Sequence, residues 1–168
     1  MKALWTDVRE TPIVGVDVEC HDDKVCVVQL ASWRRGLVLD ALALQGMMRD
    51  LLQPLLWDDR VYKVFHGHFS DLHWLQSKFS IVVNPPTIDT AVIAQELDNM
   101  WEDGQPSLQT LCRQYLDYEL DKTHKTANWR QRPMPAEMLE YAAMGAQVLL
   151  PLCAAIEMVM SSSVWGND

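Results

Sequence analysis

The chain has 168 residues, of which 49% are hydrophobic, and we expect one globular domain spanning residues 1–168 with a substantial core. Its net charge of −9 argues against non-specific wrapping of long nucleic acid, which depends on attraction to phosphate. No apolar run approaches the roughly 20 residues of a membrane span, and the first residues lack the apolar core of a signal peptide. The sequence therefore predicts an intracellular protein that does not enter a membrane.

Strand patterns dominate the first half of the chain. Runs of apolar and β-branched residues predict strands at Ile13–Glu19, Val25–Ser32, Leu37–Asp40 and Val61–Phe65, with a short fifth strand at Ile81–Val83. Only short turns separate the first three strands, so we expect them to pair as an antiparallel meander.

Helical patterns follow. They predict helices at Leu44–Trp57, Ser70–Phe79, Thr87–Met100, Ser107–Leu116 and Pro135–Met160, the last with a proline in its first turn. This arrangement of strands and helices is typical of an α/β protein.

Two acidic residues interrupt the first predicted strand. Asp17 and Glu19 stand among valines, and strand side chains two positions apart point to the same face. Buried acids are costly unless they are paired or bound to a cation, so this pair is a candidate metal site. The alternative is a polar strand end that faces solvent.

A second polar segment lies where the fourth strand ends and a helix begins. Asp71 falls in the first helical turn, where the helix dipole favours a carboxylate and where an acid is often only a cap. His66 and His68 have the spacing of zinc ligands, but no further Cys or His stands at metal-binding distance in the sequence. By itself, this segment indicates only strand, turn and helix.

Further motifs in a fixed order extend the pattern. They are Val16-Asp17-Val18-Glu19, His66-Gly67 through Trp74-Leu75, Ile88-Asp89-Thr90, Leu120-Asp121-Lys122, Asn128-Trp129-Arg130-Gln131-Arg132-Pro133, and Tyr141 through Leu152. In this order the segments resemble the 3′→5′ exonucleases of the ribonuclease D type (DEDDy), in particular the catalytic domain of the exosome-associated nuclear exoribonuclease. The resemblance runs from about Ile13 to Leu152.

The resemblance implies a ribonuclease H-like fold. It has a mixed five-stranded sheet, with an antiparallel meander plus parallel strands, and helices on both faces. It also implies a site of four carboxylates and a tyrosine, in which Asp17 and Glu19 match the first motif, Asp71 the second and Tyr141 the third. The family's remaining aspartate follows that tyrosine by four residues, on the same side of the helix. Here that position is Gly145.

The chemistry that the resemblance implies is hydrolysis of RNA from its 3′ end with two divalent ions, Mg²⁺ or Mn²⁺. Asp17 would contact both ions, Glu19 and the missing aspartate would serve the ion that activates water, and Asp71 would hold the other. Tyr141 would orient the water. A glycine at position 145 therefore predicts a weakened metal site.

Residues matching Trp74 and Lys122 contact the terminal nucleotide in the family, by stacking and by charge. The alternatives are a core tryptophan and a solvated lysine. Cys20 stands where relatives of the exosome branch carry a histidine. Trp129 and Arg132 are expected to pack and position the loop before the last helix, and Asp89 is expected to brace its own turn.

Gly145 leaves three interpretations open. In the first, the domain is a natural pseudonuclease kept for binding. In the second, it is an enzyme of reduced activity that uses water or Glu140 in place of the missing aspartate. In the third, the sequence has been altered at this position to trap substrate. Two functions therefore stand side by side: a metal-dependent 3′→5′ exoribonuclease with lost or reduced activity, and an inactive module that binds RNA or protein. The expected partners are single-stranded RNA 3′ ends and a protein of an RNA-processing assembly.

Overall fold

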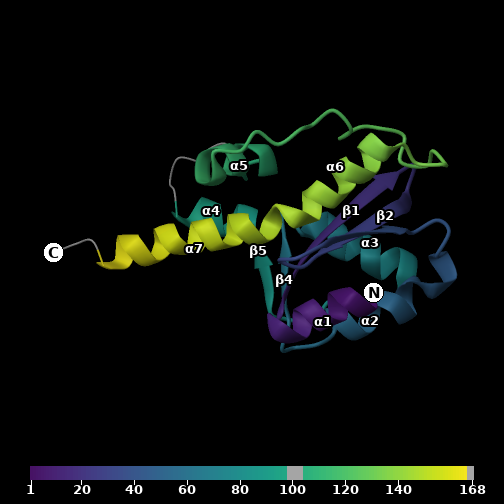
Figure 1. Cartoon of the computed structure of the whole chain (residues 1–168), viewed down its shortest axis with the longest axis horizontal. Helices are drawn as coiled ribbons and strands as arrows, with labels where there is room; N and C mark the ends of the chain where they lie inside the picture. Colours follow the sequence, from purple (N-terminus) through teal and green to yellow (C-terminus); the bar gives the residue numbers. More distant parts are fainter. Residues whose placement is uncertain (98–103, 166–168) are drawn as a thin grey trace.

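A mixed five-stranded sheet forms the centre of the protein in a computed structural model that describes residues 1–97 and 104–165. Its strands are β1 (Ile13–His21), β2 (Lys24–Ala31), β3 (Gly36–Asp40), β4 (Tyr62–Phe65) and β5 (Thr87–Asp89), in the spatial order β3-β2-β1-β4-β5 (Figure 1). β1, β2 and β3 pair antiparallel, whereas β4 and β5 continue the sheet in parallel. The predicted meander and the predicted fold class are confirmed.

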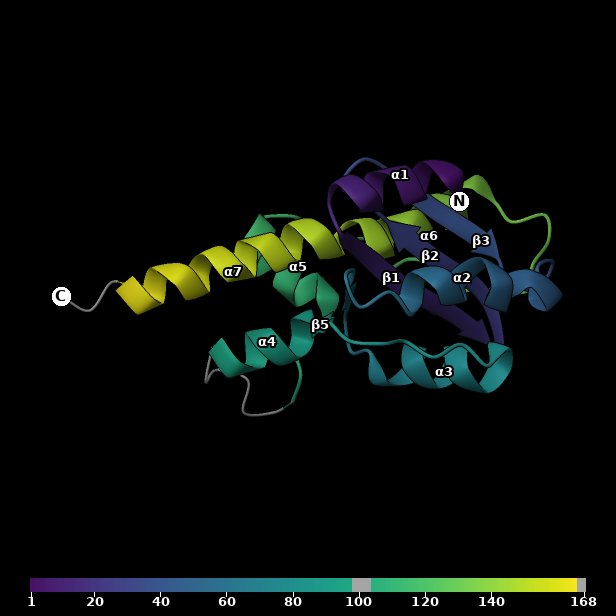
Figure 2. The same ribbon diagram turned by 90° about the horizontal axis from the view of Figure 1, so that it is seen from below.

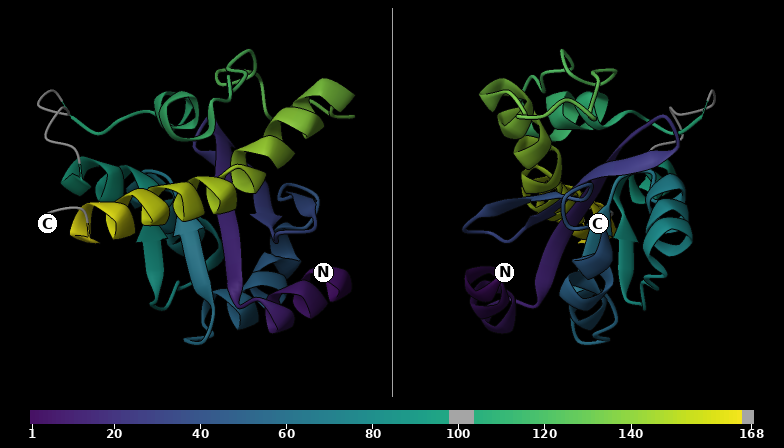
Figure 3. Two further views of the ribbon diagram at one scale, coloured as in Figure 1. Left: turned by 60° about the vertical axis from the view of Figure 1, so that its left-hand side comes forward. Right: turned by 90° about the vertical axis from the view of Figure 1, so that its right-hand side faces the viewer.

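Helices cover both faces of the sheet. They are α1 (Lys2–Glu10), α2 (Met48–Leu56), which follows the short 3₁₀ turn Gln45–Met47, α3 (Phe69–Phe79), α4 (Thr90–Leu97), α5 (Leu108–Leu116), α6 (Ala136–Gln147) and α7 (Leu149–Trp165). α1, α2 and α3 lie on one side (Figure 2), and α6 and α7 contact the other (Figure 3).

The alternation of side chains along β1 and β2 builds these two layers. Val14, Val16, Val28 and Leu30 are fully buried in the cluster beneath α1, α2 and α3. The intervening residues of both strands face the other way, where α6 packs against β2. Asp17 and Glu19 belong to this second set, so they face the α6 side of the sheet.

Gly15 allows α6 to approach β1 closely. An ideal Cβ atom built on Gly15 would overlap the main-chain oxygen of Ala146, near the end of α6. A side chain at this position would therefore push the helix away from the strand, and with it the residues that α6 presents.

The structure corrects the predicted fifth strand. Ile81–Val83 is not a strand, because the amide of Val82 donates to Gln53 and its carbonyl oxygen accepts from the same side chain. The run is apolar since Ile81 is buried in the core. The fifth strand is instead β5, and it occupies the start of the predicted helix Thr87–Met100. That helix begins at Thr90, and residues 98–100 lie outside the described part of the chain.

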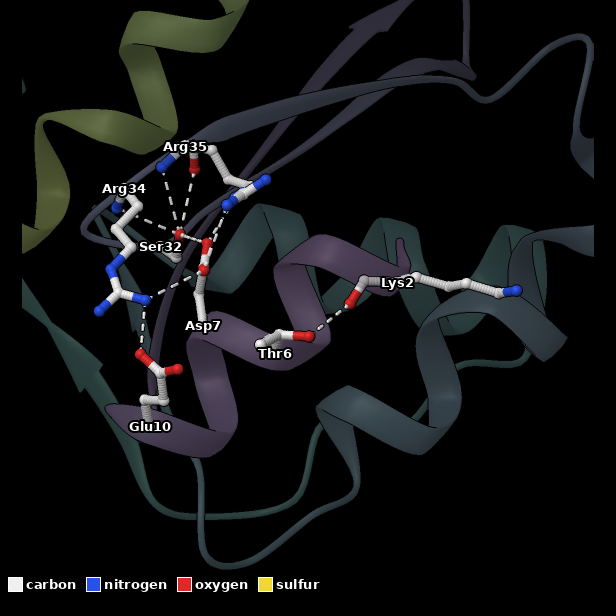
Figure 4. A network of polar contacts seen from close by, with 7 residues as sticks. All are labelled: Lys2, Thr6, Asp7, Glu10, Ser32, Arg34 and Arg35. Atoms are coloured by element: carbon white, nitrogen blue, oxygen red, sulfur yellow. Dashed lines mark hydrogen bonds and ion pairs between the residues drawn. The ribbon is translucent and has the colours of Figure 1, made fainter.

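The sequence did not predict α1, whose position depends on contacts distant in sequence. Leu4 and Val8 enter the core, and Asp7 is buried beside the loop between β2 and β3. The hydroxyl of Ser32 donates to Asp7 Oδ2 at 2.7 Å, and Arg35 Nε donates to the same oxygen at 2.6 Å (Figure 4). Through these contacts α1 is fixed to the loop that joins the two strands.

The predicted helix Pro135–Met160 is divided into α6 and α7 at Val148. The helical stretch 136–161 is, among the described residues, the one segment long and apolar enough to cross a membrane, and an 18-residue window within it has a mean hydropathy of 1.7. This corrects the expectation that no segment approaches such a length. Core helices of soluble proteins pass the same test, so the finding is weak evidence for a membrane.

Gly15→Ala is predicted to destabilise the protein by about 1–3 kcal/mol, because the added methyl group meets backbone rather than a movable side chain. The matched control is Gly46→Ala, since an ideal Cβ there has no atom within 4 Å. Denaturant unfolding of the two variants measures the difference. Equal free energies of unfolding in both variants would contradict the close approach of α6 to β1.

Candidate active site

The open end of β1 presents the first two acids. β4 pairs with β1 only from Ile13 to Gly15, so the part of β1 that carries Asp17 and Glu19 has β2 alone as its neighbour. The register with β2 shifts between Glu19 and Cys20, which marks a bulge at the same point. These features give the two carboxylates room beyond the parallel strands.

Asp71 reaches the same region from the first turn of α3. It is 7% exposed and accepts a hydrogen bond from Ser70, and no side-chain cap bond closes the start of α3. Asp89 holds the preceding turn, accepting from the amides of Gly67 at 2.9 Å and His68 at 2.8 Å. Asp71 does not cap the helix, and its position is fixed by the turn that Asp89 stabilises. Asp89 thus stabilises this turn, as expected from the sequence.

Tyr141 and Gly145 lie on α6 and face Asp17 and Glu19 across a cleft of about 300 Å³. The segment that connects α5 to α6 forms the opposite wall. The complete lining is Asp17, Glu19, Leu108, Tyr118, Leu120, Asp121, His124, Glu137, Glu140, Tyr141, Met144 and Gly145.

The three carboxylates influence one another. Burial raises the pKa of Glu19 to about 9, and the charges of Asp17 and Asp71 add to this shift. Burial also raises the pKa of Asp71 to about 8, again with help from Asp17. The pKa of Asp17 itself is raised by burial, although the amide of Val18 lowers it in part. Because the charge of Asp17 contributes to the raised pKa of both other acids, the three residues form one electrostatic cluster.

Tyr141 shares the electrostatic environment of the acids. Burial, followed by the charges of Glu19 and Asp17, raises the pKa of its hydroxyl to about 12. The hydroxyl therefore keeps its proton at neutral pH and is suited to orient a water molecule by hydrogen bonding. It is a poor general base.

Gly145 meets Asp17 directly. An ideal Cβ atom on Gly145 would overlap Asp17 Oδ2 and would lie 3.4 Å from Asp17 Cγ. Asp17 Oδ1 accepts from the amide of Val18 at 3.0 Å, so the carboxylate lies between its own backbone and α6. In the interior of a helix glycine costs roughly 1 kcal/mol relative to alanine. The close approach of Asp17 gives this glycine a structural reason.

The residues present are chemically suited to a divalent cation. Carboxylate oxygens are the ligands that Mg²⁺ and Mn²⁺ prefer, and the raised pKa values show that the cluster lacks sufficient positive charge. Within residues 1–97 and 104–165, no three His, Cys, Asp or Glu side chains already form a ready-made metal cluster. A bound cation would thus require the carboxylates to lie closer together than they do in this structure.

Known proteins with similar sequences and structures agree with this geometry. A family model described as 3′-5′ exonuclease matches residues 1–161. The chain belongs to this 3′→5′ exonuclease family. It is 36% identical over 142 residues to human exosome complex component 10, a match that covers 81% of this chain and 15% of the human protein.

Two solved structures have a fold similar to that of this chain. The catalytic core of RRP6 from Trypanosoma brucei superposes with a TM-score of 0.84 and 30% identity, covering 96% of this chain and 45% of that one. Brucella melitensis NrnC with bound Mg²⁺ gives a TM-score of 0.73 and 25% identity, covering 90% and 75%. The resemblance inferred from the sequence motifs is confirmed.

Three residues of the predicted site do not line this cleft: Asp71, Trp74 and Lys122. Trp74 is partly buried against the core on the α3 side, with the ammonium of Lys78 5.1 Å from its ring centre. Lys122 is exposed on the connecting segment. Cys20 packs against the same core as Trp74, and burial raises the pKa of its thiol to about 12.

The loop before α6 has the packing expected of it. Trp129 is 1% exposed and packs with Val27 and Ala142. Arg132 donates to both carboxylate oxygens of Asp40, at 2.6 and 2.8 Å. These contacts hold the end of the connecting segment against the sheet.

Two residues of the connecting segment that influence the site, His124 and Lys125, were not predicted from the sequence. His124 lies edge-on to the ring of Tyr141, with ring centres 5.8 Å apart, and the charge of Lys125 lowers the pKa of Glu19 in part. Both belong to an irregular segment that has no periodic pattern to reveal its position. Glu140 also lines the cleft, although its helical position is about 140° from that of Gly145, given the 3.6-residue turn.

Glu19→Gln is predicted to stabilise the metal-free protein increasingly as pH rises. Folding raises the pKa of Glu19 from about 4.5 to about 9, so its stabilising contribution is complete below the unfolded value and is lost as pH rises toward 9. Glutamine does not titrate. The difference in free energy of unfolding between variant and unaltered protein, measured in denaturant from pH 5 to pH 10, should grow and then level off.

Glu10→Gln is the control, because Glu10 lies outside the cleft and pairs with Arg34 at the surface. A pH-independent difference for Glu19→Gln would show that Glu19 is not buried among the other acids.

Proposed function

We propose that this domain engages the 3′ ends of single-stranded RNA and that Gly145 reduces its two-metal 3′→5′ hydrolysis. The observation that carries the proposal is the position of Asp17, whose carboxylate occupies the space beside Gly145 where a fourth acidic side chain would begin. Asp17, Glu19, Asp71 and Tyr141 retain the other members of the motif set. The domain thus has most of the chemical groups of an exonuclease and lacks one carboxylate.

Asp17, Glu19 and Asp71 would hold Mg²⁺ or Mn²⁺, with water in place of the fourth carboxylate. Bound divalent ions supply Lewis acidity and charge stabilisation to phosphodiester hydrolysis. The protein's own residues arrange the substrate: Tyr141 orients water through its protonated hydroxyl, and the connecting segment closes one side of the cleft. With one carboxylate fewer, we expect one ion to bind weakly and a second to bind poorly.

RNA rather than DNA is proposed because the most informative relative is named as a component of the exosome complex. By the same reasoning, the domain works in an intracellular RNA-processing assembly with a protein partner. The acidic chain supports recognition of an RNA end at a local site, since its net charge of −9 does not favour extended phosphate contacts. Trp74 and Lys122 remain proposed nucleotide contacts beyond the lining of the cleft.

The second candidate is a pseudonuclease that binds RNA or a protein without cleavage. It is favoured by the absence, among the residues described, of a ready-made group of three metal ligands. It is disfavoured by the retention of three buried acids, which are costly without a cation.

Calorimetry with Mn²⁺ tests the metal site. The unaltered protein is predicted to bind one ion weakly, and Gly145→Asp is predicted to bind at least about tenfold more tightly, equivalent to about 1.4 kcal/mol, because it supplies a further oxygen ligand. Gly145→Ala is the matched control, since its methyl group displaces Asp17 without adding a ligand. Tight occupancy of two sites in the unaltered protein would contradict a weakened centre.

Cleavage of 5′-labelled single-stranded RNA in Mg²⁺ or Mn²⁺ tests the function. Gly145→Asp is predicted to raise the rate of 3′→5′ trimming at least about a hundredfold, or about 2.7 kcal/mol in barrier height, whereas Gly145→Ala is not. The same trimming rate in the unaltered protein and the Gly145→Asp variant would refute the role assigned to Gly145. RNA binding without cleavage by either protein would favour the pseudonuclease.

A further inference from the structure

Gln29, in the middle of β2, has a side chain without any hydrogen-bond partner among the residues described. It is 0% exposed, and neither its amide nitrogen nor its carbonyl oxygen is paired. Buried side-chain amides almost always have a hydrogen-bond partner, because bulk water cannot reach them. An orphaned amide of this kind points to a partner that arrives in another state of the protein.

The register of the sheet places this amide beside the acid cluster. Gln29 is directly opposite Asp17 on the neighbouring strand. Side chains of directly opposite residues share one face of the sheet, with their Cβ atoms about 4.5–5.5 Å apart. The glutamine side chain is long enough to span this separation and reach the carboxylate of Asp17.

The packing of α6 closes the space above both residues. Val27, two positions before Gln29 on the same face, packs with Ala142. On the other side, Gly15, which is opposite Ala31, lies beneath Ala146. The amide of Gln29 is therefore enclosed under the turn of α6 that also carries Gly145.

We propose that Gln29 is a positioning residue for Asp17 in the cation-bound site. This inference rests on the proposed function, because it requires a divalent ion at the acid cluster. In this structure, Asp17 Oδ1 accepts from the amide of Val18, and Asp17 Oδ2 lies beside Gly145. With a cation held by the acid cluster, the Nε2–H group of Gln29 would donate to the carboxylate of Asp17 and fix its orientation.

This role gives the Nε2–H group of Gln29 a partner and gives Asp17 a support that does not depend on residue 145. Carboxylates that bind metals are commonly oriented by a hydrogen bond from a neighbouring group, and loss of such a group weakens metal affinity by about 10–100-fold. The site has one carboxylate fewer than the family pattern, so its affinity depends more heavily on the orientation of the ligands that remain.

Gln29→Met separates this role from a purely structural one. Methionine is similar in length and has no amide, so it removes the orphaned polar group and retains the packing. The melting temperature of the metal-free variant should therefore stay level or rise. Its dissociation constant for Mn²⁺, measured by calorimetry, should increase about 10–100-fold. Opposite changes in the two measurements are the signature of a positioning residue.

Val28→Ala is the matched control. Val28 immediately precedes Gln29 in β2, is equally buried and faces the other side of the sheet. Its truncation should therefore lower the melting temperature without changing the affinity for Mn²⁺. If the unaltered protein binds too weakly for comparison, both variants are measured with Gly145→Asp in the background.

The outcomes distinguish the inference from the function on which it rests. Equal affinity for Mn²⁺ in the unaltered protein and in Gln29→Met overturns the positioning role and leaves the metal site intact. The same loss of affinity in Gln29→Met and Val28→Ala also overturns it, since general destabilisation would then explain both. Failure of the unaltered and Gly145→Asp proteins to bind Mn²⁺ overturns the proposed function and the inference together.

Discussion

The close approach of α6 to β1 is the constraint on which the site depends. It requires the absence of a side chain at Gly15, where the main chain of α6 comes nearest to the strand. One turn of contact then places Tyr141 and Gly145 opposite Asp17 and Glu19. A wider separation would still allow a core between helix and sheet, but the acids would lose the helix as the second wall of their cleft.

The same approach creates the electrostatic character of the cleft. Three acids are enclosed near one another, and burial is the first cause of the raised pKa of each. Lys125 lowers the pKa of Glu19 only in part. In the metal-free protein the cluster therefore retains protons well above the ordinary range of carboxylates, and a cation would compete with those protons for the same oxygens. Metal affinity and pH are thus coupled at this site.

Sequence patterns predicted the parts of the fold that are locally encoded. β1, β2 and β4 have runs of buried side chains, β3 has an apolar run that includes the buried Leu39, and α3 and α5 have clear helical periodicity. β5 is only three residues long and is defined by backbone pairing with β4, so no pattern of side chains identified it. α1 was missed because its buried Asp7 looks like a surface residue until Ser32 and Arg35 are seen beside it.

The same distinction applies to the candidate site, because residues in short local motifs were predicted and a residue placed by distant contacts was not. The acids and Tyr141 were found because each stands in a short motif on a regular element. His124 was not, since it belongs to an irregular segment whose path depends on anchors such as Trp129. The motif order also identified Gly145 as a missing carboxylate. It did not reveal that Asp17 lies in the space beside Gly145, which depends on the spacing between helix and strand.

Gly145 therefore has two physical consequences that act on different residues. It leaves this position of the motif without a carboxylate, and it lets the carboxylate of Asp17 lie against α6. A domain with no further contact with cations would gain stability by replacing its buried acids, because their ionised forms are poorly solvated there. Asp17, Glu19 and Asp71 are all present, and the amide of Gln29 lies opposite Asp17 without a partner. Together these groups support the proposed cation site, in which Asp17, Glu19 and Asp71 would be the ligands and Gln29 would orient Asp17.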